Sequence, residues 1–223
     1  LTCVLGPDHP RPLTVRHSLA CAYASDDRHD EAITLFEQVI TDRARILGYN
    51  HPHTLTARNN LASAYASAER HDEAITLYEQ VAQDQARALG KDHPHTLTTL
   101  NNIAYTYRSV GRLDEAITLY ENLLPNHIRV LGADHPDTLT SRHNLAGAYV
   151  LASRFDEDIT LYEQIITENA PIQGEDHPNT LTARRNLAYA YKSADRLSEA
   201  ITLYEQVATD RARVLGEDHP DTL

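Results

Sequence analysis

The sequence has little cysteine, no long apolar run and no excess of basic charge. Two cysteines, Cys3 and Cys21, among 223 residues are too few for a disulfide framework. We interpret them as small hydrophobic residues in a reducing compartment, which predicts a cytoplasmic protein. No apolar run approaches the ~20 residues of a membrane-spanning helix, and no signal peptide is visible. The net charge of −12 argues against binding to nucleic acid or to an anionic membrane surface, since both favour a basic face.

Motifs that signal catalysis are also missing. The chain contains no Gly-x-Ser-x-Gly nucleophile elbow, no glycine-rich phosphate loop and no His-Glu-x-x-His zinc signature. Each of these motifs places a nucleophile, a phosphate cradle or a set of metal ligands where the chemistry requires them. We therefore expect a protein that is not an enzyme and that has no cofactor.

What the chain does contain is one short pattern repeated at a fixed interval. A His-Pro pair recurs every 42 residues, beginning at His9, His51, His93, His135, His177 and His219. A fixed period of this size is typical of a repeat array, in which each unit buries its apolar face against its neighbours. The pattern therefore predicts a single elongated array over residues 1–223 and not separate globules.

Each repeat is predicted to form two helices. In the second repeat, apolar residues fall at helical spacing over residues 52–67 and again over residues 73–89. The Asp or Asn before each His-Pro pair is expected to cap the first helix, with Pro in its first turn, and Asp72 is expected to cap the second helix. Gly48 and its counterparts follow the second helix, where glycine adopts a left-handed conformation cheaply.

Five such helix pairs are expected, and no strand. They occupy approximately residues 10–47, 52–89, 94–131, 136–173 and 178–215, with partial helices at 1–5 and 219–223. The sequence starts at Leu1 without a methionine and stops within a repeat. We therefore expect it to be a piece of a longer protein.

Alanine recurs at two positions where the helices of a pair are expected to cross. The first series is Ala20, Ala62, Ala104, Ala146 and Ala188, and the second is Ala32, Ala74, Ala116 and Ala200. Asp158 interrupts the second series, and because a buried unpaired carboxylate is costly, we expect it to reach solvent or Arg154. Pro125 should kink the second helix of the third pair, and Pro171 should end that of the fourth pair near Glu168.

The repeats resemble the tetratricopeptide repeat consensus of Leu, Gly or Ala and Tyr, followed by Ala, an aromatic residue and a small apolar residue. The matching residues of the second repeat are Leu61, Ala62, Tyr65, Ala74, Tyr78 and Val81. The usual period of that family is about 34 residues. The longer form here, with its Leu-Gly-x-Asp-His-Pro and Asn-Asn-Leu-Ala segments, is similar to the repeats of kinesin light chains. It is also similar to arrays attached to bacterial signalling ATPases of the STAND/NB-ARC type.

The resemblance implies a right-handed α-solenoid, a superhelix of antiparallel helix pairs. It also implies a non-catalytic scaffold that binds a peptide or protein segment in its concave groove. Two other functions stay open: the array is the sensor arm of a larger STAND-type ATPase, or it is a module that associates with itself through exposed array ends. Because one scaffold serves many partners, the resemblance does not identify the partner.

In this family the first helices line the groove, which gives a set of candidate peptide-binding residues. They are Asn59, Asn60, Asn101, Asn102, Tyr105, Arg108, His143, Asn144, Arg185, Asn186, Tyr189 and Lys192. An amide suits a peptide group, an arginine can form a fork onto a carboxylate, and a tyrosine supplies stiff contact area. We therefore expect an acidic or carboxylate-bearing partner segment at the third to fifth repeats. The alternative is that these Asn and Arg side chains bond only to neighbouring helices.

The 13 histidines suggest a metal site, but their spacing argues against one. Successive His-Pro pairs lie a whole repeat apart, too far to share an ion bound at about 2 Å. The local pairs His51/His53 and His93/His95 lack a third ligand nearby. We therefore expect no bound metal and interpret the histidines as capping and loop-packing residues.

Overall fold

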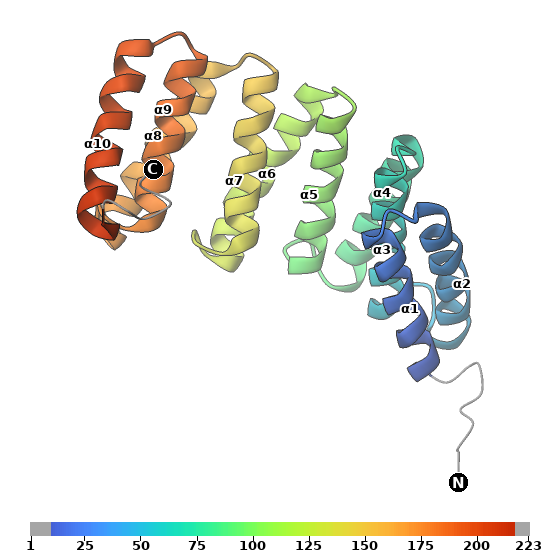
Figure 1. The fold of residues 1–223 in the computed structure, drawn as a ribbon. Coiled ribbons are helices and arrows are strands. Elements are labelled where there is room, and N and C mark those ends of the chain that lie inside the picture. Colours follow the sequence, from blue (N-terminus) through green and yellow to red (C-terminus); the bar gives the residue numbers. More distant parts are fainter. Residues whose placement is uncertain (1–9, 217–223) are drawn as a thin grey trace. The chain divides into compact units, whose positions relative to one another are not determined.

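The computed structural model describes residues 10–216, and every regular element in that range is an α-helix. Figure 1 shows the helices, which are α1 Pro10–Ser25, α2 His29–Leu47, α3 Pro52–Ser67, α4 His71–Ala88, α5 Pro94–Ser109, α6 Leu113–Leu131, α7 Pro136–Leu151, α8 Phe155–Gln173, α9 Pro178–Ser193 and α10 Leu197–Leu215. The predicted all-α fold of antiparallel helix pairs is confirmed. The partial helices predicted at 1–5 and 219–223 lie outside the described residues, as does Cys3.

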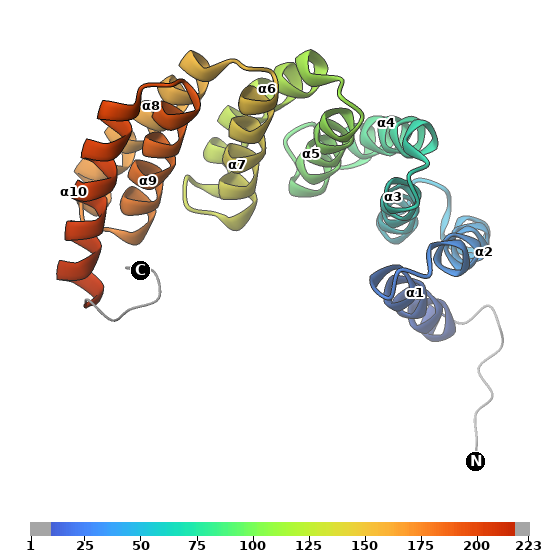
Figure 2. The same cartoon turned by 45° about the horizontal axis from the view of Figure 1, so that its top comes forward.

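The chain forms two compact units, Leu1–Ser141 and Arg142–Leu223, and the division falls inside α7. In the first unit, α1 packs on α2, α3 on α4 and α5 on α6, and each pair also contacts the next. In the second unit, α9 packs on both α8 and α10. Figure 2 shows that the odd-numbered helices of the first unit form one layer and the even-numbered helices the other. We call the outer surfaces of these layers the first-helix face and the second-helix face.

The His-Pro pairs start the first helices through the imidazole ring. The Nδ1 atom of His51 accepts a hydrogen bond from the backbone N–H of His53 at 3.2 Å, and the rings of His93 and His177 act in the same way. Pro52 occupies the first turn, where its missing N–H costs nothing. The N-cap residue is therefore histidine, and the expectation of an Asp or Asn cap is wrong.

The second helices also begin differently from the expectation. The N-cap residue of α4 is Arg70 and not Asp72, and the Arg70 side chain makes no capping hydrogen bond. Arg70 forms an ion pair with Glu73 and stacks on Tyr65, 4.5 Å from the ring centroid. The same arrangement of Arg, Glu and Tyr recurs around Arg28, Arg112, Arg154 and Arg196. It joins the end of each first helix to the start of the second.

The two second helices that contain a proline, α6 and α8, end at glycine and not at that proline. Helix α8 continues through Pro171 to Gln173, so the end expected near Glu168 is wrong. Gly174 follows with φ of 99°, a conformation that suits glycine and strains other residues, and its N–H donates to the carbonyl of Ala170 at 3.0 Å. Each proline removes only one backbone hydrogen bond from its helix, and α6 likewise continues through Pro125 to Leu131.

The hydrophobic core is completed from one repeat to the next. The buried cluster around Phe36 in the first helix pair includes Leu61 of α3, and the cluster around Tyr78 in the second pair includes Ile103 of α5. Alanines at the helix crossings, such as Ala62, have no exposed surface, which lets the two helices of a pair approach closely. Each repeat therefore buries its apolar face against its neighbour, as expected of a repeat array.

Asp158 of α8 does not escape from the core. Its side chain is 1% exposed, and the Oδ1 atom has no hydrogen-bond partner. The expectation that Asp158 reaches solvent or Arg154 is therefore wrong. Burial raises the pKa of Asp158 to about 7, because a neutral carboxylic acid loses less hydration energy than a carboxylate on burial.

An ion pair links the two helices in four of the helix pairs, and it is most buried in the second pair. Arg58 of α3 has a 2% exposed side chain and donates from Nη1 to Oδ2 of Asp84 on α4 at 2.6 Å. We call this Arg–carboxylate pair the clamp. Its counterparts are Arg16–Asp42 at 2.7 Å, Arg184–Asp210 at 2.7 Å and Arg142–Glu168 at 3.7 Å. The remaining pair, α5 and α6, has Leu100 and Asn126 at these positions.

Replacing Asp158 with alanine, the residue of the other repeats, should stabilise the protein in a pH-dependent way. The unfolded carboxyl ionises near 3.8, whereas the folded one ionises at about 7. Between these values the folded state binds the extra proton, so the wild type loses roughly 1.4 kcal/mol of stability per pH unit as pH rises, about 4 kcal/mol in all. Urea unfolding followed by circular dichroism should show a larger gain for D158A at pH 8 than at pH 5. An equal gain at both pH values would contradict the buried, protonated carboxyl.

Candidate functional site

The predicted asparagines on the first helices bond mainly within the fold. Asn59 accepts on Oδ1 from Thr99 Oγ1 at 2.9 Å, and Asn101 accepts on Oδ1 from Ser141 Oγ at 3.0 Å. Each of these bonds joins one first helix to the next. The two amides therefore hold neighbouring repeats together, which was the alternative to ligand binding.

The next position along the helix is also occupied by bonded amides. Asn60 donates from Nδ2 to Nε2 of His17 at 3.2 Å. Asn102 and Ser63 both donate to the hydroxyl of Tyr78 from α4. Burial raises the pKa of Tyr78 to about 12, and these two hydrogen bonds oppose that rise. Asn102 therefore lies on the first-helix face with one hydrogen bond already made to Tyr78.

The second unit repeats this arrangement. Asn186 hydrogen-bonds to Tyr162, whose pKa burial raises to about 12. Asn144 is only 7% exposed. Of the predicted asparagines, Asn144 is the one most enclosed by its own unit.

Tyr105 and Arg108 are the predicted residues of the first unit that form a surface feature. The Tyr105 side chain is 49% exposed, and the guanidinium carbon of Arg108 lies 4.9 Å from the centroid of its ring. Such stacking holds both side chains in place and leaves polar edges available. The sequence placed these two residues one turn apart on the same helix side, and the structure brings them together.

A hollow of about 410 Å³ lies beside Tyr105 on the first-helix face, between α3 and α5. Its lining includes Ser63, Ser67, Thr106 and Ser109, and the hydroxyls of Thr106 and Ser109 already donate to backbone carbonyls of α5. Hydroxyl groups both donate and accept hydrogen bonds, which matches the needs of a peptide backbone. The hollow, which we call the first-helix hollow, is therefore suited to a short polar segment.

The second unit presents a basic and aromatic stripe on α9. Arg185, Tyr189 and Lys192 are spaced four and three residues apart, so they share one side of the helix. All three are exposed, and Arg185 donates from Nη2 to Oδ1 of Asn186 at 3.2 Å. His143 on α7 is also exposed. The predicted basic residues of this unit are therefore accessible.

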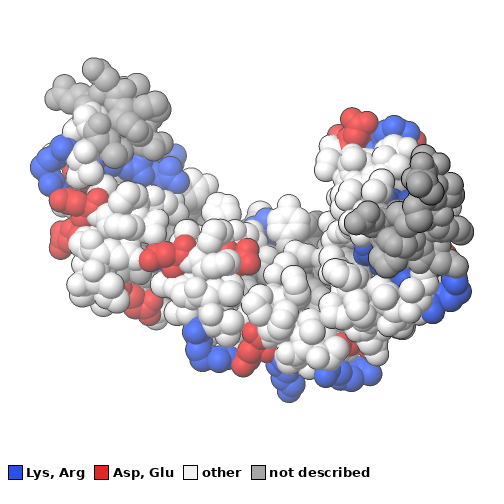
Figure 3. Space-filling view, turned by 90° about the horizontal axis from the view of Figure 1, so that it is seen from below, with Lys and Arg blue, Asp and Glu red and all other residues white. Residues whose placement is uncertain are grey.

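On one face of the described residues, charge is distributed in small groups. Figure 3 shows one face, on which basic side chains lie close to acidic ones and between uncharged areas. On the described part of this face there is no continuous basic surface of the kind that nucleic acid binding requires.

Neither a metal cluster nor a membrane span is present in residues 10–216. No three side chains of His, Cys, Asp or Glu in that range come together as a metal would need. No helix in that range is both long and apolar enough to cross a bilayer.

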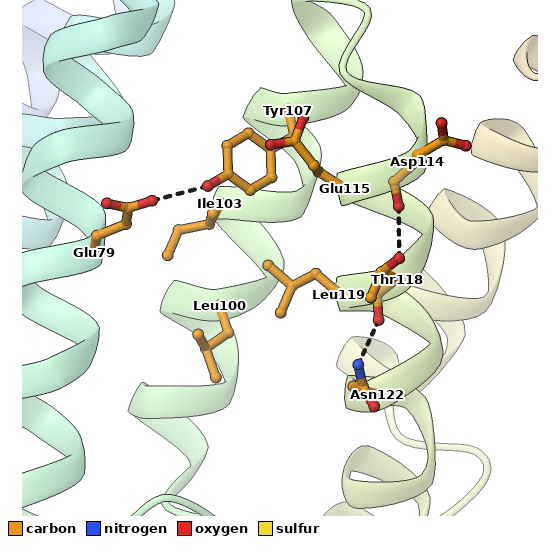
Figure 4. Close-up of a pocket in the computed structure, with 9 residues that line it drawn as sticks. All are labelled: Glu79, Leu100, Ile103, Tyr107, Asp114, Glu115, Thr118, Leu119 and Asn122. Atoms are coloured by element: carbon orange, nitrogen blue, oxygen red, sulfur yellow. Dashed lines mark hydrogen bonds between the residues drawn. The ribbon is translucent and has the colours of Figure 1, made fainter.

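A larger hollow on the second-helix face was missed by the sequence analysis. It has a volume of about 480 Å³ and lies between α4 and α6 over α5. Figure 4 shows Leu100, Ile103 and Leu119 directed into it, with Glu79 at one side. A second hollow of about 390 Å³ adjoins it and shares Leu100, Leu119 and Asn122. We call the two together the second-helix groove.

The signal for this groove was present in the sequence. Arginine occurs at positions 16, 58, 142 and 184, always with an acidic residue 26 positions later, and only Leu100 and Asn126 break this pairing. Periodicity within a single helix does not reveal this pairing, because the two members of each pair lie on different helices. A comparison of the five repeats position by position would have found it.

Comparisons with known proteins agree with these observations. A tetratricopeptide repeat family model matches residues 23–83, 53–124 and 96–167, and a second tetratricopeptide repeat model matches residues 180–221. No protein of curated function matches the chain.

Solved structures show the same fold. The nearly identical TPR-like repeats of a putative kinesin light chain from Podosopora anserina are 34% identical, with a TM-score of 0.81 over 93% of this chain and 98% of that chain. BtubC (BKLC) from P. vanneervenii is 21% identical, with a TM-score of 0.71 over 91% and 80% of the two chains. The Rap conjugation gene regulator of plasmid pLS20, solved in complex with the Phr* peptide, is 13% identical, with a TM-score of 0.57 over 92% and 58%.

Removing the amides that join neighbouring repeats should destabilise the fold. Asn59→Ala and Asn101→Ala each delete an acceptor for a partly buried hydroxyl, which should lower the free energy of unfolding by about 1–2 kcal/mol. Tyr105→Ala removes an exposed ring and should change it by less than about 0.5 kcal/mol. Urea unfolding measures all three. Equal stability of N101A and the wild type would show that this amide is not needed for repeat packing.

Proposed function

Because the chain belongs to the tetratricopeptide repeat family, we propose that it is a non-catalytic scaffold that binds a peptide segment of a partner protein on its first-helix face. Tetratricopeptide repeats generally mediate protein–protein interactions. The Rap regulator with its Phr* peptide is an example of a related fold that carries a peptide. Partner choice depends on the side chains of the face and not on the fold.

The observation that carries the proposal is the first-helix hollow beside Tyr105. Its hydroxyl lining offers hydrogen bonds to a peptide backbone, and the ring of Tyr105 supplies contact area at low entropic cost. Arg108 stacks on that ring, so a planar guanidinium lies at the edge of the hollow. Because Thr106 and Ser109 already donate their hydroxyl hydrogens within α5, their oxygens serve as acceptors for peptide N–H groups, and Tyr105 and Arg108 contribute most of the recognition.

The expected partner segment is acidic. Arg108 in the first unit, and Arg185 with Lys192 in the second unit, place positive charge on first helices of a chain whose net charge is −12. A guanidinium binds a carboxylate through two parallel hydrogen bonds, which gives both affinity and orientation. We propose that each unit, by itself, binds an acidic or carboxylate-bearing segment through such a contact.

Replacing the arginines should weaken binding to acidic peptides. Arg108→Ala and Arg185→Ala each remove one charge-assisted contact, which should raise the Kd of an acidic peptide by about tenfold. A peptide array screened with the wild type identifies the peptide, and fluorescence anisotropy measures its Kd for each variant.

The matched control is Arg87→Ala. Arg87 lies on α4 with a 72% exposed side chain and does not line the first-helix hollow, so its loss changes net charge equally without touching that face. R87A should leave the Kd within about twofold of wild type. Unchanged binding of acidic peptides by both R108A and R185A would rule out the proposed contacts.

A further inference from the structure

At the second-helix groove one clamp is replaced by neutral residues. In the second repeat, Arg58 fills the corresponding space, with its guanidinium bonded to Asp84 and stacked on Tyr49 at 4.0 Å from the ring centroid. In the third repeat, Leu100 stands at the Arg58 position and Asn126 at the Asp84 position. Both charges are absent together, so no unpaired buried charge remains.

The floor of the groove is apolar. Leu100 and Ile103 come from α5, and Leu119 comes from α6 (Figure 4). In the adjoining hollow, Leu97 and Leu123 continue the apolar lining. A row of aliphatic side chains in a recess of this size accepts apolar side chains of a partner, because burying them removes apolar surface from water.

The rim of the groove is acidic at one end. Glu79, Asp114 and Glu115 line the larger hollow, and no Lys or Arg does. Glu115 is already paired with Arg112, and Glu79 accepts a hydrogen bond from the hydroxyl of Tyr107 at 2.8 Å. Neither Glu79 nor Asp114 forms an ion pair with another described residue. This end of the groove therefore attracts positive charge.

We propose that the second-helix groove binds a basic segment of a partner protein, with aliphatic side chains on Leu100 and Leu119 and a lysine or arginine near Glu79 and Asp114. A second copy of this chain is the less suitable occupant, because its net charge of −12 opposes an acidic rim. The site is separate from the first-helix hollow and prefers the opposite charge. The two sites therefore allow the chain to hold two different segments.

The test restores the missing clamp. The double variant L100R/N126D gives the third repeat the Arg and Asp of its neighbours, leaves net charge unchanged and fills the groove. The probe is a fluorescein-labelled octapeptide with two adjacent leucines flanked by lysines, measured by fluorescence anisotropy. The wild type should bind it, and L100R/N126D should bind it at least about tenfold more weakly. Binding of an acidic peptide to the first-helix face should not change.

Two further measurements keep the test decisive if the double variant is unstable. E79Q/D114N keeps the shape of the rim and removes its two unpaired charges, so it should raise the Kd of the lysine-leucine peptide about fivefold or more. Thr98→Ala, at an exposed position on α5 that does not line the groove, should leave the Kd unchanged.

Several results would overturn the proposal. One is that the wild type does not bind the lysine-leucine peptide. Another is that the wild type binds a peptide with serines in place of the leucines equally well, which would indicate charge attraction without a groove. A third is that L100R/N126D folds and binds the lysine-leucine peptide with the same Kd as the wild type. A fourth is that sedimentation velocity detects a dimer of the wild type but a monomer of L100R/N126D, which would assign the groove to a second copy of the chain.

Discussion

The guanidinium of Arg58 is buried between two helices with a carboxylate beside it, and this ion pair links the two helices of the repeat. Arg58 and Asp84 meet at 2.6 Å, with the arginine side chain almost fully enclosed. Removing either partner leaves a charge in a site that water reaches poorly. The pair can therefore be exchanged only as a whole. Leu100 and Asn126 are that exchange, and both residues line the second-helix groove.

The two faces of the first unit differ in chemistry. The first-helix hollow is lined by hydroxyls and bordered by Arg108 and Tyr105, so it suits a polar, acidic segment. The second-helix groove has an aliphatic floor and an acidic rim, so it suits a basic segment with apolar side chains. A repeat array can acquire such a site by changing one repeat, because each repeat contacts only its neighbours.

The 42-residue period and the alanine series predicted the helices and their pairing, since both reflect packing that every repeat shares. Details that depend on a single side-chain direction were harder to predict. The cap at His51 was assigned to its neighbour because Asp and Asn are commoner caps, and the imidazole Nδ1 accepts the same hydrogen bond. Asp158 was expected to leave the core, but its alanine-sized slot keeps it there, and protonation reduces the cost. The bonds of Asn59 and Asn101 cross between repeats, which periodicity within one helix cannot reveal.

The most direct test of the account is a double-mutant cycle on the clamp of the second repeat, measured by urea unfolding. Asp84→Asn alone leaves Arg58 buried without its carboxylate and should cost about 3–5 kcal/mol. Arg58→Leu alone should also be destabilising. The double variant R58L/D84N, which copies the third repeat, should cost clearly less than the sum of the two single changes, with a coupling energy of at least about 1 kcal/mol. Strictly additive costs would contradict the claim that the two residues form one exchangeable pair.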